Sequence, residues 1–349
     1  MSSVMRRSAR TSAPRWPAAA AVVLGTCLTL AGPAPSAGAA PTHPVPTVFF
    51  GDSYTANHGI PPLDRESIPS ALCLRSTENF PAVATRRLAE QGVTLDIQAD
   101  VSCSGARVHH FWERQPLPFA RGEVPPQNEA LTNDTLLAVG SMGGNTLGFH
   151  DILKQCSAAL RGQSVLPGEP VDEDEPAAKC AEFFEVGDGK RWLDDRLAQV
   201  ASDLERMLEN IRLLSPRARP VLVGYPRLVP EDTVKCLAPA PGQTHLPLAD
   251  IPQDAMPVLD GIQKRLDDVM EKAAADLGAD FVDLYARTGG NTVCDGADRG
   301  IGGLLEISPS LLPWYAHPNG KGRDIQAEQV ADKVVEILGE AEAGVDRRT

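Results

Sequence analysis

Short runs of mostly apolar residues recur along the chain and predict buried strands. They lie at residues 47–50, 135–139, 220–225 and 280–284. Strands that are apolar on both faces are typical of a parallel sheet whose two sides are covered by helices. A further run, residues 94–99, alternates apolar and polar positions and predicts a strand with one buried face.

Between these runs, apolar residues recur every three or four positions, which is the pattern of an amphipathic helix. The longest such segment spans residues 192–211, and shorter ones span 80–91, 262–277 and 322–338. Asn79 offers an N-cap for the first of the shorter helices. The alternation of strands and helices predicts the α/β class with a central, mostly parallel sheet.

Polar or glycine-containing turns follow the first three predicted strands. Ser53 follows the first strand along the chain, Gly105 the second and Asn145 the third. In parallel α/β sheets the groups that carry out chemistry lie beyond the carboxyl ends of the strands, so we expect these residues at one edge of the sheet. Taken singly, each has a structural explanation, since a serine after a strand is most often a helix N-cap.

His317 lies in a Pro-Trp-Tyr-Ala-His-Pro-Asn-Gly segment just before the last predicted helix. A serine becomes nucleophilic at neutral pH when a base lies beside it. The reaction also needs hydrogen-bond donors where the carbonyl oxygen of the substrate becomes negative. Ser53 and His317 offer the nucleophile and the base, and the Gly105 N–H and the Asn145 amide offer donors.

The N-terminal part of the chain differs in composition from the rest. It carries four arginines and no acid, followed by an apolar stretch and an Ala-Gly-Ala sequence. This order is that of a secretory signal peptide, and the apolar stretch is short for a transmembrane helix. We therefore expect a signal peptide at residues 1–39, a folded domain at 40–339 and a disordered tail at 340–349, in a secreted protein.

Charge narrows the range of partners. The full chain has a net charge of −13, and removal of the predicted signal peptide lowers Lys plus Arg from 33 to 29 against 46 acids, which gives −17. Nucleic acids are bound through cationic surfaces, so we expect no nucleic-acid partner. An acidic surface favours solubility. We expect a monomer without stable membrane insertion.

Six of the seven cysteines lie outside the predicted signal peptide. An even number of cysteines in an exported chain predicts disulfides. Among the possible pairings we favour neighbours in sequence, which pairs Cys73 with Cys103, Cys156 with Cys180 and Cys236 with Cys294. No two of them form a CxxC pair, which argues against a zinc site, and no motif is that of a phosphate loop. We therefore expect no cofactor.

Four short blocks, in order along the chain, resemble those of the SGNH hydrolases, also called the GDSL esterase/lipase family. They read GDSYTAN at 51–57, CSGA at 103–106, GGNTLGF at 143–149 and HPNGKG at 317–322. The secreted actinobacterial branch, which is also known for three disulfides, is the most similar. The resemblance runs from about residue 48 to residue 334. It implies a flavodoxin-like three-layer α/β/α sandwich and hydrolysis of carboxylic esters through an acyl-serine.

The resemblance also implies roles for single residues. By position, Ser53 is the nucleophile and His317 is the general base and then the general acid. The Ser53 N–H, the Gly105 N–H and the Asn145 amide form the oxyanion hole. One departure follows Asn145, where Thr146 replaces an Asp that is common in the family.

The second departure concerns the residue that orients His317. Many members have an Asp three residues before this histidine, and Trp314 occupies that position here. Some members of the actinobacterial branch use a backbone carbonyl instead, so we expect a Ser53–His317 dyad in which the Trp314 C=O accepts from the imidazole Nδ1–H. Glu306 and Asp283 are the alternative orienting groups.

The function that these resemblances favour is a secreted serine esterase or lipase acting on a small-molecule or lipid ester. A phospholipase, a thioesterase or a carbohydrate O-deacetylase would use the same site, and a catalytically silent ligand-binding protein is the alternative from another class. Arg75, Arg107 and Arg114 lie near the second block and are candidates for binding an anionic head group. The acidic, proline-containing stretch at 165–176 predicts an exposed loop, which is either a lid or an insertion.

Overall fold

The computed structural model describes residues 43–65, 70–117, 122–163 and 168–346. The described residues all belong to one compact unit, Ala39–Thr349. The predicted signal peptide at 1–39 therefore lies outside the described residues.

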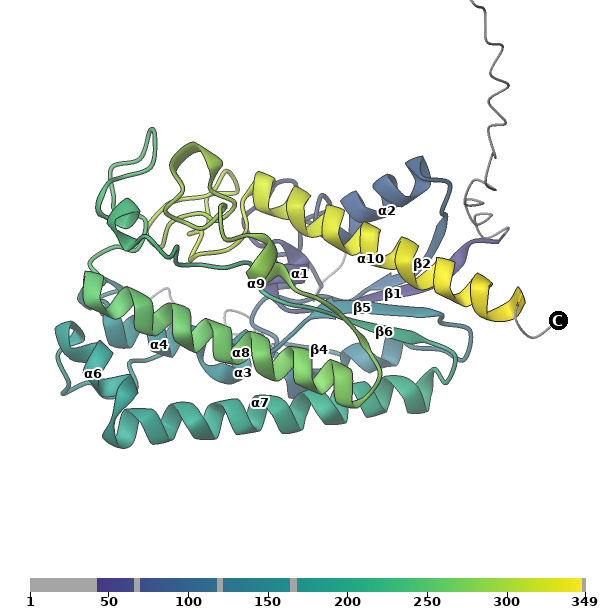
Figure 1. The fold of residues 1–349 in the computed structure, drawn as a ribbon, viewed down its shortest axis with the longest axis horizontal. Coiled ribbons are helices and arrows are strands. Elements are labelled where there is room, and N and C mark those ends of the chain that lie inside the picture. Colours follow the sequence, from purple (N-terminus) through teal and green to yellow (C-terminus); the bar gives the residue numbers. More distant parts are fainter. Residues whose placement is uncertain (1–42, 66–69, 118–121, 164–167, 347–349) are drawn as a thin grey trace, which may run out of the picture. The chain divides into compact units, whose positions relative to one another are not determined.

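A five-stranded parallel sheet forms the centre of this unit (Figure 1). Its strands, in spatial order, are β2 (Leu95–Asp100), β1 (Val45–Gly51), β5 (Leu137–Ser141), β6 (Arg219–Val223) and β7 (Asp280–Val282). Numbered by their order along the chain, the five strands run 2-1-3-4-5, which is the flavodoxin-like order. Ligands of such sheets bind beyond the carboxyl ends of the strands, where the strand order reverses.

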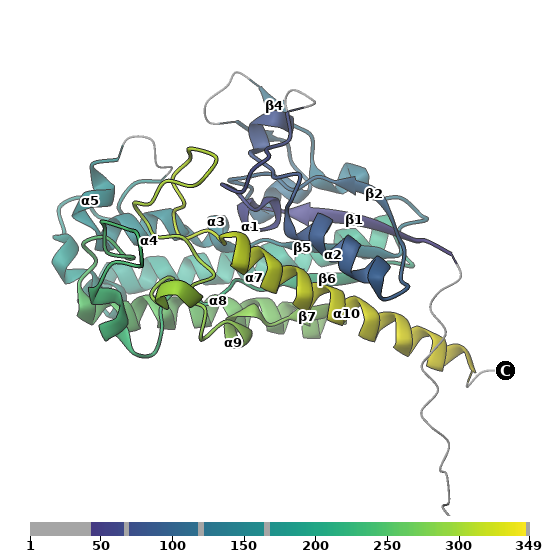
Figure 2. The same ribbon diagram turned by 90° about the horizontal axis from the view of Figure 1, so that it is seen from above.

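Helices cover both faces of the sheet (Figures 1 and 2). One face carries α7 (Gly187–Leu214) and α8 (Met256–Asp276), and the other carries α2 (Phe80–Glu90) and α10 (Gly320–Asp346). Successive side chains of a strand point to opposite faces. Phe50 of β1 accordingly packs in the core beside α7 and α8, whereas Phe49 packs in the core beside α2 and α10. The predicted three-layer α/β/α sandwich is confirmed.

Shorter elements connect these layers. They are α1 (Ser53–Ala56), α3 (Gly144–Leu147), α4 (Phe149–Cys156), α5 (Ala158–Arg161), α6 (Cys180–Glu185), α9 (Leu284–Arg287) and an antiparallel pair, β3 (Gln115–Pro116) and β4 (Glu123–Val124). The helices α1 and α3 are single turns that begin just beyond β1 and β5. Segments of four residues are too short to show a helical periodicity, so the sequence does not predict α1 and α3.

Two of the expected features differ in the structure. The alternating run at 94–99 predicts that Ile97 is buried, but Ile97 is 39% exposed because β2 is the edge strand of the sheet. The predicted tail at 340–349 begins inside α10, which continues to Asp346. Its sequence there, Glu-Ala-Glu-Ala, is rich in good helix formers.

Three disulfides join the six cysteines as neighbours in sequence. Cys73 pairs with Cys103, Cys156 with Cys180 and Cys236 with Cys294. The first ties the chain before α2 to the turn after β2. The second closes the segment that contains the acidic loop, and the described part of that loop bonds to α4, with the Glu169 N–H donating to Asp151. No helix in the described ranges is long and apolar enough to cross a membrane.

Candidate active site

The end of β1 brings Ser53 to the carboxyl edge of the sheet. Gly51 has φ +139°, and a Cβ there would lie 2.1 Å from the Thr55 Oγ1 and 2.8 Å from the Ser141 carbonyl oxygen, so the turn requires glycine. The Gln127 side chain bonds this residue twice, accepting from the Gly51 N–H at 2.7 Å and donating to the Gly51 C=O at 2.9 Å.

Asp52, and not Ser53, caps the helix that begins here. Asp52 is the N-cap of α1, and its Oδ1 accepts from the Tyr54 N–H at 2.8 Å. Ser53 is the first helical residue, so its hydroxyl is not needed as a cap. The structural explanation that serines in this position usually have does not apply to Ser53.

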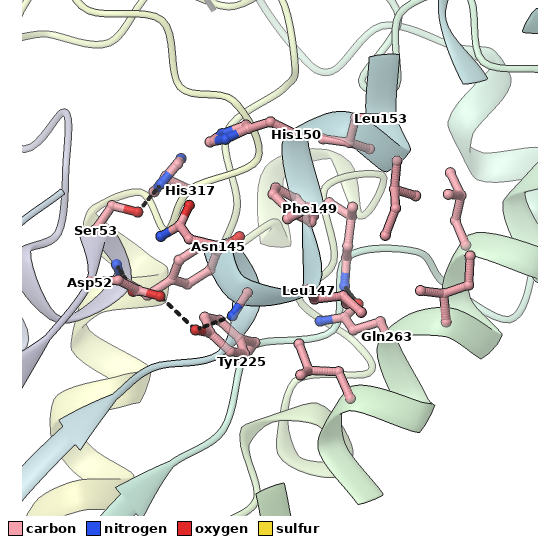
Figure 3. Close-up of a pocket in the computed structure, with 17 residues that line it drawn as sticks. Asp52, Ser53, Asn145, Leu147, Phe149, His150, Leu153, Tyr225, Gln263 and His317 are labelled. Carbon is pink, nitrogen blue, oxygen red and sulfur yellow. Dashed lines mark hydrogen bonds between the residues drawn. The ribbon is translucent and has the colours of Figure 1, made fainter. Parts of the chain in front are cut away.

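The Ser53 hydroxyl lies against His317 (Figure 3). The Ser53 Oγ and the His317 Nε2 are 2.7 Å apart. On the other side of the imidazole, Nδ1 lies 2.7 Å from the Trp314 carbonyl oxygen and 3.1 Å from that of Tyr315. Two carbonyl acceptors place the proton on Nδ1, which leaves the Nε2 lone pair to accept the serine proton.

Strained backbone brings both carbonyls to the imidazole. Tyr315 and Ala316 have φ values of 47° and 61°, in the left-handed region that side-chain-bearing residues rarely adopt. The Tyr54 hydroxyl holds this turn by donating to the Ala316 C=O at 2.7 Å. The Trp314 ring is buried between Gly59 and Gly302, where a Cβ would lie 2.9 Å and 2.3 Å from ring atoms.

The two alternative orienting acids lie elsewhere. Glu306 forms an ion pair with Arg299. Asp283 caps α9, where its Oδ1 accepts from the Ala286 N–H at 2.8 Å. Neither carboxylate bonds to His317 among the contacts of the described residues.

The other two predicted site residues follow the strands on either side of β1. Gly105 follows β2, is exposed, and has φ +80°. The Gln115 Nε2 donates to the Ser104 C=O at 2.9 Å, and because this carbonyl and the Gly105 N–H belong to one peptide unit, the bond fixes the direction of the N–H. In the described part of the chain, neither the Gly105 N–H nor the Ser53 N–H donates to another protein group.

Asn145 lies in α3, at the end of β5. Its Nδ2 donates to the Ala106 C=O at 3.0 Å, which orients the amide and leaves its second N–H for another acceptor. Thr146, the departure from the family pattern, accepts from the Val108 N–H at 2.9 Å through its Oγ1 and so ties α3 to the turn after Gly105.

Tyr225 is a site residue that the sequence analysis missed. Its hydroxyl donates to the Asp52 Oδ2 at 2.6 Å and accepts from the Gly144 N–H at 2.8 Å (Figure 3). Burial raises the pKa of Asp52 to about 7, against the bonds from Tyr225 and Tyr54 that lower it. Tyr225 lies just beyond the carboxyl end of β6. Functional groups of parallel sheets lie beyond such strand ends, so the same reasoning, applied to this fourth strand, would have identified Tyr225.

Two further histidines, His58 and His150, lie near the candidate base. The His58 ring is 5.0 Å from the His317 ring, and its Nε2 lies 3.1 Å from the Pro313 carbonyl oxygen. Burial lowers the pKa of His317 well below 6.5, and the positive charge that His58 and His150 can carry lowers it further. His317 is therefore neutral at neutral pH, which is the form that a general base requires.

An apolar pocket extends from Ser53 between α4 and α8 (Figure 3). Ser53, Asn145 and His317 lie together at one end of it (Figure 3). The rest of the lining is mainly aliphatic and aromatic, with Leu147, Phe149, Ile152, Leu153, Leu228, Leu259, Ile262 and Leu266. A pocket of this composition suits a hydrocarbon chain bonded to a carbonyl group at the serine. Among the described residues, no group of three or more His, Cys, Asp or Glu side chains is placed to hold a metal ion.

Comparison with known sequences gives three matches of note. A model of the GDSL-like lipase/acylhydrolase family matches residues 49–325. An esterase of Streptomyces scabiei is 67% identical over 343 residues, which cover 97% of this chain and 99% of that protein. Lipase 2 of Streptomyces coelicolor is 31% identical over 85% of this chain and 89% of its own length.

Solved structures share the fold. An extracellular lipase from Streptomyces rimosus superposes with a TM-score of 0.57 at 20% identity, over 83% of this chain and 99% of its own. Phospholipase A1 from Streptomyces albidoflavus superposes with a TM-score of 0.56 at 20% identity, over 84% of this chain and 99% of its own.

Proposed function

The chain belongs to the GDSL-like lipase/acylhydrolase family and is a carboxylic ester hydrolase, and from this premise we propose that Ser53 and His317 are its catalytic dyad. The observation that carries the proposal is the 2.7 Å contact between the Ser53 Oγ and the His317 Nε2. Because Nδ1 faces two carbonyl oxygens, Nε2 is free to take the serine proton.

The reaction proceeds in two halves. Ser53 Oγ attacks the ester carbonyl carbon while its proton passes to the His317 Nε2. The carbonyl oxygen becomes negative and accepts from the Ser53 N–H, the Gly105 N–H and the Asn145 amide. The carbon–oxygen bond to the alcohol then breaks, the leaving oxygen takes the proton from Nε2, and an acyl-serine remains. Water, deprotonated by His317, attacks the acyl-serine and releases the acid and free Ser53.

The Trp314 carbonyl supports His317 in place of a carboxylate. It fixes the tautomer and the ring orientation, as the Asp of a triad does, and it carries only a partial negative charge. The second carbonyl, that of Tyr315, adds to this partial charge at 3.1 Å. Together the two dipoles stabilise the imidazolium that forms in the transition state.

We propose an esterase or lipase with a hydrophobic acyl group as substrate, because the pocket beside Ser53 is mainly apolar. A carbohydrate deacetylase would need room only for an acetyl group. A phospholipase would need cationic groups for the phosphate, and two of the candidate arginines already pair with acids, Arg75 with Asp64 and Arg114 with Glu123.

We also propose that the protein is secreted and acts as a monomer. The arginine-rich start followed by an apolar stretch supports export, and so do the three disulfides, which form in oxidising compartments. N-terminal sequencing of the protein from a culture supernatant tests this proposal, with a start near residue 40 as the expected result.

Ser53→Ala and His317→Ala test the dyad. Each is expected to lower kcat by about 10⁴-fold or more on a chromogenic ester, because nucleophile and base act as one unit. Ser202→Ala, on the exposed side of α7, is the matched control and should keep full activity. Hydrolysis by either dyad variant at a rate within tenfold of the unaltered protein would contradict the assignment.

A further inference from the structure

One buried hydroxyl connects the strand end that carries Ser53 with the strand end that carries Asn145. The Tyr225 hydroxyl donates to Asp52, which precedes Ser53, and accepts from the N–H of Gly144, which precedes Asn145. The two bonds, of 2.6 Å and 2.8 Å, form a continuous path between the nucleophile and the amide donor (Figure 3).

The path is closed to solvent. Asp52 is 1% exposed and Tyr225 is 6% exposed. A buried carboxyl group is stable only when its oxygens are bonded, and here Tyr225 and the Tyr54 N–H bond one oxygen each. Burial also raises the pKa of Tyr225 well above 10, so its hydroxyl keeps the proton that it donates.

The segment that holds Asn145 depends on this path. Gly144 is the first residue of α3, so its N–H has no partner within the helix. The helix is a single turn, and Gly143 and Gly148 flank it with φ values of 143° and 89°. A one-turn helix between two such glycines has little rigidity of its own. Its position therefore depends on the bonds that it makes to the rest of the protein, and the bond from Gly144 to Tyr225 fixes its first residue beside Asn145, in addition to the bonds of Asn145 to Ala106 and of Thr146 to Val108.

The same carboxyl group also anchors the side of the site that holds the base. Asp52 Oδ1 accepts from the Tyr54 N–H, and the Tyr54 hydroxyl holds the Ala316 carbonyl beside His317. The rings of Tyr54 and Tyr225 meet edge to face, with centroids 4.8 Å apart. Tyr54 thus holds the segment that carries His317, and Tyr225 holds the helix that carries Asn145.

We propose that Tyr225 is a positioning residue that sets the Asn145 amide relative to Ser53 for the transition state. This inference rests on the proposed function, because it requires Asn145 to be an oxyanion donor. Such a donor stabilises the transition state only when it stands at hydrogen-bonding distance from the developing oxyanion. A small displacement of Asn145 therefore lowers the rate of the chemical step more than the binding of the ester.

Tyr225→Phe removes only the hydroxyl and is the primary test. We expect kcat on a chromogenic ester to fall about 10- to 100-fold, because the donor is misplaced and not lost. KM is expected to change by less than about twofold. Tyr285→Phe, a buried tyrosine on α9 that does not line the pocket, is the matched control and should leave both constants unchanged.

A double-mutant cycle separates positioning from a general loss of structure. Asn145→Ala is expected to lower kcat about 10²- to 10³-fold. Adding Tyr225→Phe to Asn145→Ala should lower kcat less than about twofold further, because Tyr225 acts through the amide that is already absent. If the two losses multiply, or if Tyr225→Phe alone keeps full kcat while Asn145→Ala is impaired, the role of Tyr225 is refuted.

The cycle also separates this inference from the proposed function. Full kcat in Asn145→Ala would refute the oxyanion role itself, and Tyr225 would then have no donor to position. If Tyr225→Phe does not fold, Asp52→Asn takes its place in the same cycle. The amide oxygen can still accept from the Tyr54 N–H, so the side that holds the base is kept, while the amide NH2 replaces the oxygen that accepts from the Tyr225 hydroxyl.

Discussion

At the scale of single residues, the site supports its histidine with backbone in place of a carboxylate. The left-handed Tyr315 and Ala316 bring two carbonyl oxygens to the His317 Nδ1. Burial and the neighbouring histidines act in the opposite direction to these carbonyls and lower the pKa of His317 well below 6.5. The net result is a base that stays neutral in mildly acidic solution.

This pKa shift predicts the acid limb of the pH profile. His317 must be neutral to take the serine proton, and its lowered pKa keeps it neutral as the pH falls. We therefore expect kcat/KM to fall to zero as the pH is lowered, with the midpoint of this fall below pH 6.5. A pH series of ester hydrolysis checks this, and a complete loss centred above pH 6.5 would contradict it.

Asp52→Asn is the control for that profile. Burial raises the pKa of Asp52 to about 7, but its carboxyl group bonds only to protein groups. We expect protonation of Asp52 to lower kcat/KM only in part, and not to abolish hydrolysis. The variant should lose any step near pH 7 and keep the lower limb, which assigns that limb to His317.

At the scale of elements, the site is made by strand ends and by short helices that follow them. The apolar runs of the sequence predict β1 and β5, and an alternating run predicts β2. The rule for parallel sheets then places Ser53, Gly105 and Asn145 at one edge. The pocket wall is different, because α4 spans only eight residues and the sequence analysis does not predict it, although Phe149, Ile152 and Leu153 have helical spacing. The sequence therefore predicts the chemistry of the site and not the shape of its pocket.

The wall formed by α8 predicts a dependence on acyl length. Leu259 lines the pocket and is 6% exposed, so Leu259→Phe fills space that a hydrocarbon chain would occupy. We expect the ratio of kcat/KM for an octanoyl ester to that for an acetyl ester to fall about tenfold, a usual effect of pocket size on hydrophobic chains.

Leu237→Phe, a change at a half-exposed leucine outside the pocket lining, is the matched control for the acyl series. It should leave the ratio unchanged. An unaltered octanoyl-to-acetyl ratio in folded Leu259→Phe would show that the acyl chain binds elsewhere.

At the scale of the whole domain, the two residues of the dyad come from opposite ends of the domain's sequence. Ser53 and His317 are separated by 264 positions in the sequence. The helix after His317, α10, packs on α2, and the Gln326 side chain accepts from the Asn57 amide at 2.8 Å. The turn that carries the nucleophile and the segment that carries the base are therefore held by the same packing.

Contacts across such distances explain which site residues the sequence conceals. Gln127 reaches Gly51 across 76 positions, and Tyr225 reaches Asp52 across 173. Neither residue lies in one of the four blocks that resemble the family, although Pro125-Pro126-Gln127 also resembles the actinobacterial branch. The local sequence pattern indicates which strands end in reactive groups. The residues that orient these groups can be identified only when the sheet order and the course of the loops are known.

The central claim is that a backbone carbonyl, and no acid, orients the base. It is tested most directly by substituting the two acids that the sequence analysis gives as alternative orienting groups. The kcat of Asp283→Asn and Glu306→Gln is compared with that of Ser53→Ala on one chromogenic ester, with folding of each variant checked by circular dichroism. We expect both acid variants to stay within about fivefold of the unaltered protein, while Ser53→Ala loses about 10⁴-fold or more. If either folded acid variant falls nearly as far as Ser53→Ala, the dyad account is wrong.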